Sequence, residues 1–463
     1  MQPDATNTAR RVNSFFAGIG GFDLAFEKHG FEPSFYCEKD DFCRSVLKRN
    51  WPKVANASDI QKLDAKDVPQ ADVWTAGFPC QDLSLARTPH GKRNGLKGSQ
   101  SGLFYTFLDI LSIHKPLVVL LENVAGLLNS HKGADFNALI SSLTKLGYGV
   151  AWRVLNARYF GAPQSRPRVF ICAWLGSPEN AVKALFEDEI AIKPKNERRG
   201  FMVESRCPES GISVPQVSFC ISATSGRHTG LDWARSYVTY PDAVRRLTPL
   251  ECERLQGLPE NWTLPDKDYV MPIRGIETNR YHAIGNAVCV PVVQWISGRI
   301  SNIFQTVEDS GKSEGKLTTK VRLQNLTANY LSPKCEVLPL RTKSDESKWQ
   351  SGGVAYKGWI ATTVVSSSPV IPVPSQLIDV IEKKKVHQRY FLSANASQGI
   401  LRRVDKLGRH LFPPLDTVLR KIANPDPITE REPLGGKKKS KPMSWRLYRN
   451  DDYDQLLYHS SWG

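Results

Sequence analysis

An alternation of short apolar runs with amphipathic segments, from Arg11 to about Trp174, limits most strongly how this chain can fold. The apolar runs are RVNSFFAG, PSFYCEKD, ADVWTAGF, PLVVLLENV, GVAWRVLNA and RVFICAWL. Between them, GFDLAFEKHG and DFCRSVLKRNW carry apolar residues at helical spacing. Dense apolar runs are typical of strands that are covered on both faces. The order therefore predicts an α/β fold with a mostly parallel sheet between two layers of helices.

The pattern changes beyond this region, and the changes predict the domain boundaries. Residues 11–174 are expected to form one domain, which a helical stretch at 280–305 completes. The chain between them, 175–279, is irregular apart from the short helical segment TPLECERLQGL. The polar run TVEDSGKSEGKLTTK predicts a linker at 306–320, and residues 321–463 are expected to form a separate basic module.

Charge and cysteine usage narrow the class of protein. The chain has 463 residues and a net charge of +16, which favours a polyanionic partner such as nucleic acid. Its nine cysteines include no C-x-x-C pair, which argues against a disulfide framework or a zinc site. No apolar run approaches the roughly 18 residues that span a membrane, and the first residues do not resemble a signal peptide. We therefore expect a cytoplasmic protein with no membrane partner.

A glycine-rich turn indicates a nucleoside cofactor. The segment FFAGIGG, residues 15–21, lies between the first expected strand and the first expected helix. Glu38 follows Gly18 by twenty residues at the end of the second strand, where a carboxylate can accept hydrogen bonds from ribose hydroxyls. Asp59, after the next expected strand, could contact an adenine amino group. These residues fit NAD as well as S-adenosylmethionine.

Three further groups of reactive side chains lie at expected strand ends. Cys80 follows one strand within PCQ, Glu122 ends another within ENV, and Arg166 and Arg168 begin a third within QSRPR. Each also has an ordinary structural explanation, as a buried thiol, a solvated carboxylate or surface arginines. Because sites form where strand ends gather, we expect the four side chains to meet in one cleft beside the glycine turn.

The motifs together resemble those of DNA cytosine-5 methyltransferases of the prokaryotic or phage type. In order, they are FFAGIGGFDLAFE, CEKD, SDI, GFPCQDLS, LLENVAGLL, FGAPQSRPRVF, RRLTPLECERLQGLP and AIGNAVCVPVV. They run through residues 11–296. The departures are Ser14 in place of a common aspartate, Phe78 in place of a frequent proline, and Lys39 in place of an apolar or aromatic residue.

The resemblance implies a class I S-adenosylmethionine-dependent methyltransferase with a Rossmann-like fold. Its expected reaction is methyl transfer to C5 of cytosine within a specific double-stranded DNA sequence, for restriction-modification or phage DNA protection. The resemblance makes Cys80 the nucleophile that adds to C6 of a flipped cytosine. It places Glu122 at N3 and Arg168 at O2, and it leaves Arg166 to orient a loop or Glu122. The cofactor residues implied in the same way are Phe16, Gly18, Gly20, Glu38, Asp59, Gly77, Asn286 and Val288.

DNA contacts are expected in two places. The basic, glycine-rich loop after Cys80, residues 84–102, could close over DNA as a lid, and the irregular region 175–279 is expected to recognise the target sequence. The expected DNA-contacting residues are Gln81, just before the loop, with Ser84, Arg87 and Arg93 in it and Arg227 in the irregular region. We expect a monomer that needs no metal, and the resemblance leaves room for a cognate restriction endonuclease that acts separately.

The sequence is also compatible with several alternatives. The same fold could serve tRNA cytosine-5 methylation, a catalytically silent DNA-binding regulator or a nicotinamide oxidoreductase. In the basic module, SANASQGILRRVDKLGRHL predicts a helix with Ile400, Leu401, Val404 and Leu407 on one face. That module could contact DNA, or it could be a structural or partner-binding domain.

Overall fold

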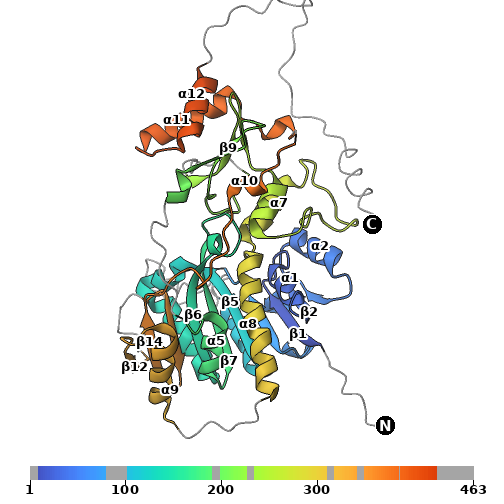
Figure 1. Ribbon diagram of the computed structural model, residues 1–463. Helices are drawn as coiled ribbons and strands as arrows, with labels where there is room; N and C mark the ends of the chain where they lie inside the picture. The colour runs from blue at the N-terminus through green and yellow to red at the C-terminus, as the bar shows by residue number, and fades with distance from the viewer. Residues whose placement is uncertain are drawn as a thin grey trace, which may run out of the picture.

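The computed structural model describes residues 9–79, 102–189, 199–226, 234–309, 317–340, 349–384 and 386–424. Within these ranges a large α/β body lies below a smaller lobe that carries the last two helices (Figure 1). No helix in the described part of the chain is long and apolar enough to cross a lipid bilayer.

The first half of the main sheet is parallel, as expected. Its strands are β1 (Arg10–Phe15), β2 (Phe31–Cys37), β3 (Ala55–Ala57), β4 (Val73–Ala76) and β5 (Val118–Val124). They lie in the order β5-β4-β1-β2-β3, so the chain reverses its direction of travel across the sheet next to β1. Ligand sites in open α/β sheets form at such a reversal, outside the carboxyl ends of the strands.

The other half of the body's sheet contains one reversed strand. Strand β7 (Pro167–Leu175) lies between β5 and β6 (Tyr148–Asn156) and is antiparallel to both. Strands β1 to β6 therefore point the same way, which confirms the expected Rossmann-like class. Because β7 is reversed, its start lies at the edge where β5 ends, and Arg168 pairs with Val124.

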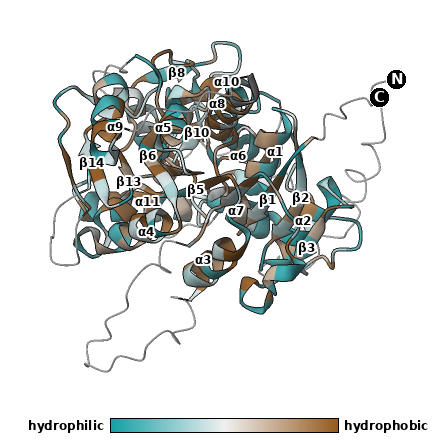
Figure 2. Cartoon of the chain, turned by 90° about the horizontal axis from the view of Figure 1, so that it is seen from below, coloured by the Kyte–Doolittle hydropathy of each residue, from teal (hydrophilic) through white to brown (hydrophobic). Residues whose placement is uncertain are grey.

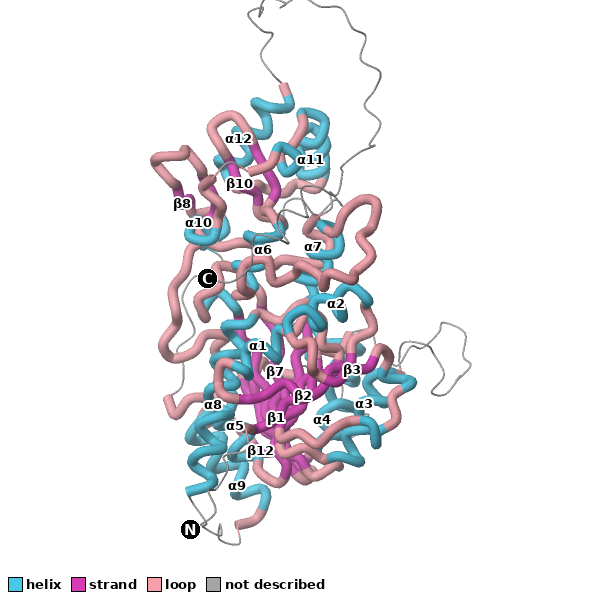
Figure 3. Tube along the Cα trace, turned by 90° about the vertical axis from the view of Figure 1, so that its right-hand side faces the viewer, coloured by secondary structure: helices cyan, strands magenta, loops and turns pink. Residues whose placement is uncertain are grey.

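Helices cover both faces of the sheet (Figure 3). One face packs against α1 (Gly21–Glu27), α2 (Asp41–Asn50), α5 (Pro178–Leu185) and α8 (Val290–Asp309), and the other against α3 (Leu103–His114) and α4 (Ala134–Lys145). Seen from below, these helices surround the strands, and hydrophobic residues (brown) alternate along them with hydrophilic ones (teal) (Figure 2). The short helical turns are η1 (Ile60–Lys62), η2 (Ala65–Asp67), η4 (Ala125–Gly133), η5 (Ala157–Tyr159), η6 (Arg199–Phe201), η8 (Thr327–Leu331) and η9 (Gln388–Tyr390).

The smaller lobe is built on a four-stranded antiparallel sheet. Its strands, in the order β11-β10-β9-β8, are β8 (Glu204–Arg206), β9 (Ser213–Pro215), β10 (Tyr237–Thr239) and β11 (Val244–Arg246). Helices α6 (Pro249–Gln256) and α7 (Glu277–Asn286) connect this lobe to the body. Thr248 and Glu251 form a capping box at the start of α6, and Glu251 also forms a buried ion pair with Arg245 at 2.7 Å.

The C-terminal residues differ from the prediction, because they do not form a separate module. Strands β12 (Val337–Pro339), β13 (Gly352–Tyr356) and β14 (Trp359–Thr363) extend the main sheet, and β13 pairs antiparallel with β6. The expected linker is also partly wrong, since α8 continues as far as Asp309. The C-terminal strands join the sheet because β6 would otherwise leave an unpaired edge, to which β13 bonds. The Trp152 ring of β6 also packs against the Trp349 ring from this later segment, with 5.5 Å between the ring centroids.

The last described residues pack on the smaller lobe instead. The elements after β14 are α10 (Leu377–Val380), α11 (Ala394–Lys406) and α12 (Pro413–Ala423), while α9 (Thr319–Leu326) precedes β12. Helices α11 and α12 share a hydrophobic cluster with Tyr237 of β10 and Val244 of β11. The C-terminal chain therefore completes both parts of the protein.

Candidate active site

The segment that leads to Cys80 passes between the glycine turn and Glu122. Gly77 follows β4, and a methyl group added to it would lie 3.9 Å from the Phe16 carbonyl oxygen. The same methyl group would lie 4.0 Å from Glu122 Oε2. The two groups of residues that the sequence associates with the cofactor and with catalysis are therefore neighbours at one edge of the sheet.

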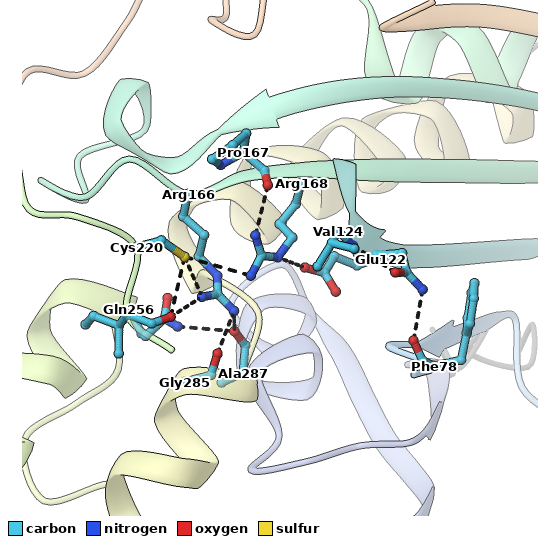
Figure 4. A network of polar contacts seen from close by, with 12 residues as sticks. Phe78, Glu122, Val124, Arg166, Pro167, Arg168, Cys220, Gln256, Gly285 and Ala287 are labelled. Carbon is cyan, nitrogen blue, oxygen red and sulfur yellow. Dashed lines mark hydrogen bonds and ion pairs between the residues drawn. The ribbon is translucent and has the colours of Figure 1, made fainter. Parts of the chain in front are cut away.

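Glu122 and Arg168 form an ion pair at this edge (Figure 4). Arg168 Nε lies 3.0 Å from Glu122 Oε1, and Glu122 is only 8% exposed at the end of β5. The contact joins opposite charges within a largely buried environment. Burial raises the pKa of Glu122 above its ordinary value, although the positive charges of Arg168 and Arg166 oppose the shift. A carboxyl group in this position can hold a proton more readily than one in water.

Arg166 has a different environment from Arg168. It is 2% exposed, and its guanidinium donates hydrogen bonds to the carbonyl oxygens of Ile221, Gly285 and Ala287 at 2.8, 3.0 and 2.7 Å. A further contact of 3.3 Å reaches Cys220 Sγ. These partners come from the lobe and from the end of α7, so Arg166 joins the two parts of the protein behind Arg168 (Figure 4).

Asn123 holds the strand end that precedes the expected nucleophile. Its side-chain amide donates a hydrogen bond of 2.9 Å to the carbonyl oxygen of Phe78, and its own oxygen accepts one from Val124 N. Asn123 is 3% exposed, and a buried carbonyl without a partner is costly. Asn123 was not among the expected site residues, although it occupies the centre of the ENV motif.

The glycine turn and Glu38 form the second half of the site. Gly18 N donates to Glu38 Oε2 at 2.7 Å, and Asp40 N donates to Oε1 at 2.8 Å. Phe16 and Gly18 both have positive φ, 52° and 56°, and no described atom lies within 4 Å of a methyl group built on Gly18. Burial raises the pKa of Glu38, an effect that the two backbone hydrogen bonds counteract. The backbone at Gly18 is therefore open to a ligand, and two backbone N–H groups hold the Glu38 carboxylate beside it.

The other expected cofactor residues surround this turn. Asp59 begins η1, where Oδ1 accepts a hydrogen bond from Gln61 N at 3.0 Å and Oδ2 lies 3.7 Å from Lys39 Nζ. A methyl group on Gly20 would lie 2.3 Å from the Trp51 ring, so a side chain cannot fit there. Val288 packs against the start of α1, 2.8 Å from a methyl group built on Gly21.

Two glutamines and a glycine that were not among the expected site residues support the surroundings of Arg166. Gln164 donates to Gln256 Oε1 at 2.9 Å, and Gln256 donates to the Ile284 carbonyl oxygen at 2.8 Å. A methyl group on Gly285 would lie 2.2 Å from the backbone of Ser222 and Ala223. All three residues lie within the motifs, but only the paired contacts reveal their role. Asn286, at the end of α7, is exposed.

Six expected site residues lie outside the described ranges. They are Cys80, Gln81, Ser84, Arg87, Arg93 and Arg227. Their expected roles stay predictions. The described neighbours of Cys80 end at Pro79.

A cleft of about 450 Å³ lies in the smaller lobe beside the arginines. Its walls include Ser165, Cys220, Ser222, Tyr237 and Arg246. Cys220 Sγ is 3.9 Å from Arg168, so the cleft adjoins the Glu122–Arg168 pair.

Comparison with known proteins identifies the family. A family model described as C-5 cytosine-specific DNA methylase matches residues 10–204 and 216–302. The chain belongs to this family. Among similar methylases, the type II methyltransferase M2.BsuMI of Bacillus subtilis (strain 168) is 33% identical over 324 residues, which cover 67% of this chain and 79% of that protein.

Two further type II methyltransferases are similar to this methylase. M.Bsp6I of Bacillus sp. (strain RFL6) is 30% identical, with 64% of this chain and 99% of the relative covered. M.MspI of Moraxella sp is also 30% identical, with 67% and 75% covered. The expected family, fold class and enzyme activity are confirmed: the chain is a DNA cytosine-5 methyltransferase. Residues 317–424 of the described chain lie outside the family match.

Proposed function

We propose that this methylase transfers a methyl group from S-adenosylmethionine to C5 of a cytosine flipped out of a specific double-stranded DNA sequence. The observation that carries the proposal is the position of the Phe78 carbonyl. The side-chain amide of Asn123 donates a hydrogen bond of 2.9 Å to this carbonyl oxygen. Asn123 follows Glu122 directly in the chain, and Phe78 precedes Cys80 by two residues. The proposed reaction requires the Cys80 thiol, two residues further along the chain, to reach a base held by Glu122 and Arg168.

The proposed chemistry begins with the Cys80 thiolate. Its bond to C6 of cytosine makes C5 an electron-rich enamine carbon, which is the atom that accepts the methyl group. Glu122, with its raised pKa, donates or holds the proton at N3, and the Arg168 guanidinium stabilises negative charge at O2. Loss of the C5 proton to a base and departure of the thiolate then restore the aromatic ring.

The cofactor pocket proposed for this reaction is the glycine turn with Glu38. S-adenosylmethionine, when bound, supplies a methyl group on a positively charged sulfur. Glu38 would accept hydrogen bonds from the ribose hydroxyls, because its two oxygens are already oriented by Gly18 N and Asp40 N. Phe16, Gly77 and Val288 would enclose the cofactor, Asp59 would contact the adenine amino group, and Asn286 would lie at the rim.

Arg166 is proposed as a positioning residue. Its hydrogen bonds to Ile221, Gly285 and Ala287 would keep Arg168 and the lobe in register with the flipped base. The irregular lobe would recognise the DNA sequence, and the loop after Cys80 would close over the duplex. The biological role proposed from the type II relatives is restriction-modification or phage DNA protection.

The decisive experiment follows labelled methyl transfer to duplex DNA and then sequences the modified sites. We expect 5-methylcytosine at one short motif with the wild-type protein, and no transfer with Cys80→Ser, because a hydroxyl is a much weaker nucleophile at C6 than a thiolate. The matched control is Cys335→Ser, a thiol in the C-terminal segment whose Sγ contacts the Thr362 carbonyl oxygen.

A covalent trap tests the same mechanism by a second route. DNA that contains 5-fluorocytosine cannot lose a proton from C5, so the wild-type protein should remain attached to it through denaturing electrophoresis. Cys80→Ser should form no adduct, and Cys335→Ser should form as much as wild type. Full methylation by Cys80→Ser would exclude Cys80 as the nucleophile.

A further inference from the structure

Helix α11 presents a polar, cationic face opposite its buried side. Ile400, Leu401 and Val404 are buried, while Asn395, Arg402, Lys406 and other residues of the opposite side are exposed. Residues 395, 402 and 406 are separated by seven and four positions, so they share one side of the helix. This cationic face of α11 is defined here by Asn395, Arg402 and Lys406.

The two cations on this face make no polar contacts within the described structure. No hydrogen bond or ion pair to a described residue involves Arg402 or Lys406. On the neighbouring helix, Arg420 pairs with Asp416 at 2.8 Å and with Asp405 at 3.4 Å. Lys406 lies in the last turn of α11, where a cation favours the helix dipole, but Arg402 lies further from that end and has no such explanation.

Helix α11, which carries the cationic face, packs on the smaller lobe. Leu392 N, just before α11, donates to the Val244 carbonyl oxygen of β11 at 2.8 Å. Gln398 of α11 donates to the Ala423 carbonyl oxygen of α12 at 2.8 Å. Tyr237 packs in the hydrophobic cluster under α11 and α12 and also lines the cleft beside Arg168. Tyr237 therefore contacts both the cleft beside the reaction site and the α11–α12 helix pair.

We propose that the cationic face of α11 binds the phosphate backbone of duplex DNA that flanks the methylated sequence. The proposal rests on the chain's activity as a DNA methyltransferase, which supplies a polyanionic partner at the adjoining cleft. Charge complementarity favours this partner, since the chain carries a net charge of +16 and both cations are free of carboxylates among the described residues. Phosphate contacts position a protein on DNA and carry no sequence information.

The test uses the full chain with Arg402→Gln and Lys406→Gln combined, which removes both charges and preserves helix formation. Binding is measured over a range of salt concentrations on two duplexes centred on the methylated sequence, of about one and about four helical turns, one turn being about 10 base pairs. On the longer duplex, the slope of log affinity against log salt should become shallower by about 1.8, at about 0.9 for each lost phosphate contact. On the shorter duplex, the variant and wild type should agree.

Two control proteins make the result specific. Arg402→Lys with Lys406→Arg keeps both charges and should keep the wild-type slope. Lys28→Gln with Lys145→Gln removes two exposed charges at the ends of α1 and α4 and should also leave the slope unchanged. The methylated motif should be the same for every protein.

Two outcomes would overturn the proposal. An unchanged slope on the longer duplex would mean that this face does not contact DNA and is solvated or meets another protein. A changed methylation motif would mean that the face reads bases. Normal methylation of the shorter duplex by the variant would still support the proposed reaction, so a failure of this proposal is distinguishable from a failure of the proposed function.

Discussion

At the scale of single residues, Glu122 and Arg168 form the charged pair of the site, with 3.0 Å between Oε1 and Nε. Both were expected at one edge of the sheet, because a motif places each of them at a strand end. Arg166 was not predictable in the same way, because its partners are backbone carbonyls of Ile221, Gly285 and Ala287. A backbone acceptor has no residue type, so a sequence motif cannot signal it.

Asn123→Ala should reduce turnover. The change leaves the Phe78 carbonyl without its buried partner and loosens the segment before Cys80, and misplacement by about 1 Å can cost on the order of 100-fold in rate. We expect kcat to fall roughly 10- to 100-fold with little change in the KM for S-adenosylmethionine. Asn123→Asp keeps the shape but lacks the N–H donor, so it should not restore the rate. A normal kcat in either variant would contradict the role.

Asp23 should make stability depend on pH. It is 1% exposed, accepts a hydrogen bond from Ser14 at 2.7 Å, and has its pKa raised to about 6 by burial. Between about pH 4 and 6 the folded protein holds a proton that the unfolded chain releases, so the free energy of unfolding falls as pH rises through this range. The loss is about 3 kcal/mol for a shift of about two pKa units.

The measurement for Asp23 is urea unfolding at several pH values. Asp23→Asn has no titrating group at this position, so its unfolding midpoint should lack this decrease between pH 4 and 6. The wild-type and variant curves should therefore diverge in favour of the variant above pH 6. Parallel curves for the two proteins would show that Asp23 does not titrate in this range.

Secondary-structure elements were predicted well where helices alternate with strands and poorly near the C-terminus. The runs GGVAY and WIATT are short, and β13 pairs with a strand far away in the sequence. One local signal was present: Lys357 and Gly358 both have positive φ, 42° and 80°, as a two-residue hairpin turn requires. A lysine–glycine pair between two apolar runs is a hairpin signal, but it does not reveal which strand the hairpin joins.

Gly353→Ala should destabilise the protein through β13. The added methyl group would lie 2.3 Å from the Trp152 ring and 2.5 Å from the Ala361 carbonyl oxygen, both of which are held in the sheet. Overpacking of this kind costs roughly 1–3 kcal/mol, which a lower thermal unfolding midpoint would reveal. The matched control is Gly399→Ala within α11, where the nearest atom is the flexible Arg403 guanidinium and alanine favours the helix. Equal midpoints for Gly353→Ala and wild type would contradict this packing.

At the scale of the whole molecule, the family match and the folded unit have different limits. The match ends at residue 302, and M.Bsp6I is covered over 99% of its length by part of this chain. In this chain, β12–β14 nevertheless belong to the main sheet, and α11 and α12 cover β10 and β11. The sequence did not reveal this arrangement. The change in composition at the expected linker suggested a domain boundary, and pairing between distant segments leaves no local pattern.

A protein that ends at Gln305 should fail to fold stably. The truncation exposes the hydrogen-bonding edge of β6, the rings of Trp152 and Phe136, and the apolar surface around Tyr237. An open, apolar strand edge promotes aggregation, so we expect most of the truncated protein in the insoluble fraction. Size-exclusion chromatography and circular dichroism would test the soluble remainder. A monodisperse, active truncated enzyme would show that the C-terminal strands are dispensable.

The pairing of β13 with β6 also has a consequence for synthesis on the ribosome. Trp152 and its hydrogen-bond partner Gln350 are 198 positions apart in the chain. At about 5–20 residues per second, roughly 10–40 s of translation separate β6 from the strand that covers it. During that time the nascent sheet has an open edge, so we expect cellular yield to depend on chaperones and on slow, cool expression. DNA modification by a new molecule would then have to wait until its last strands have been made.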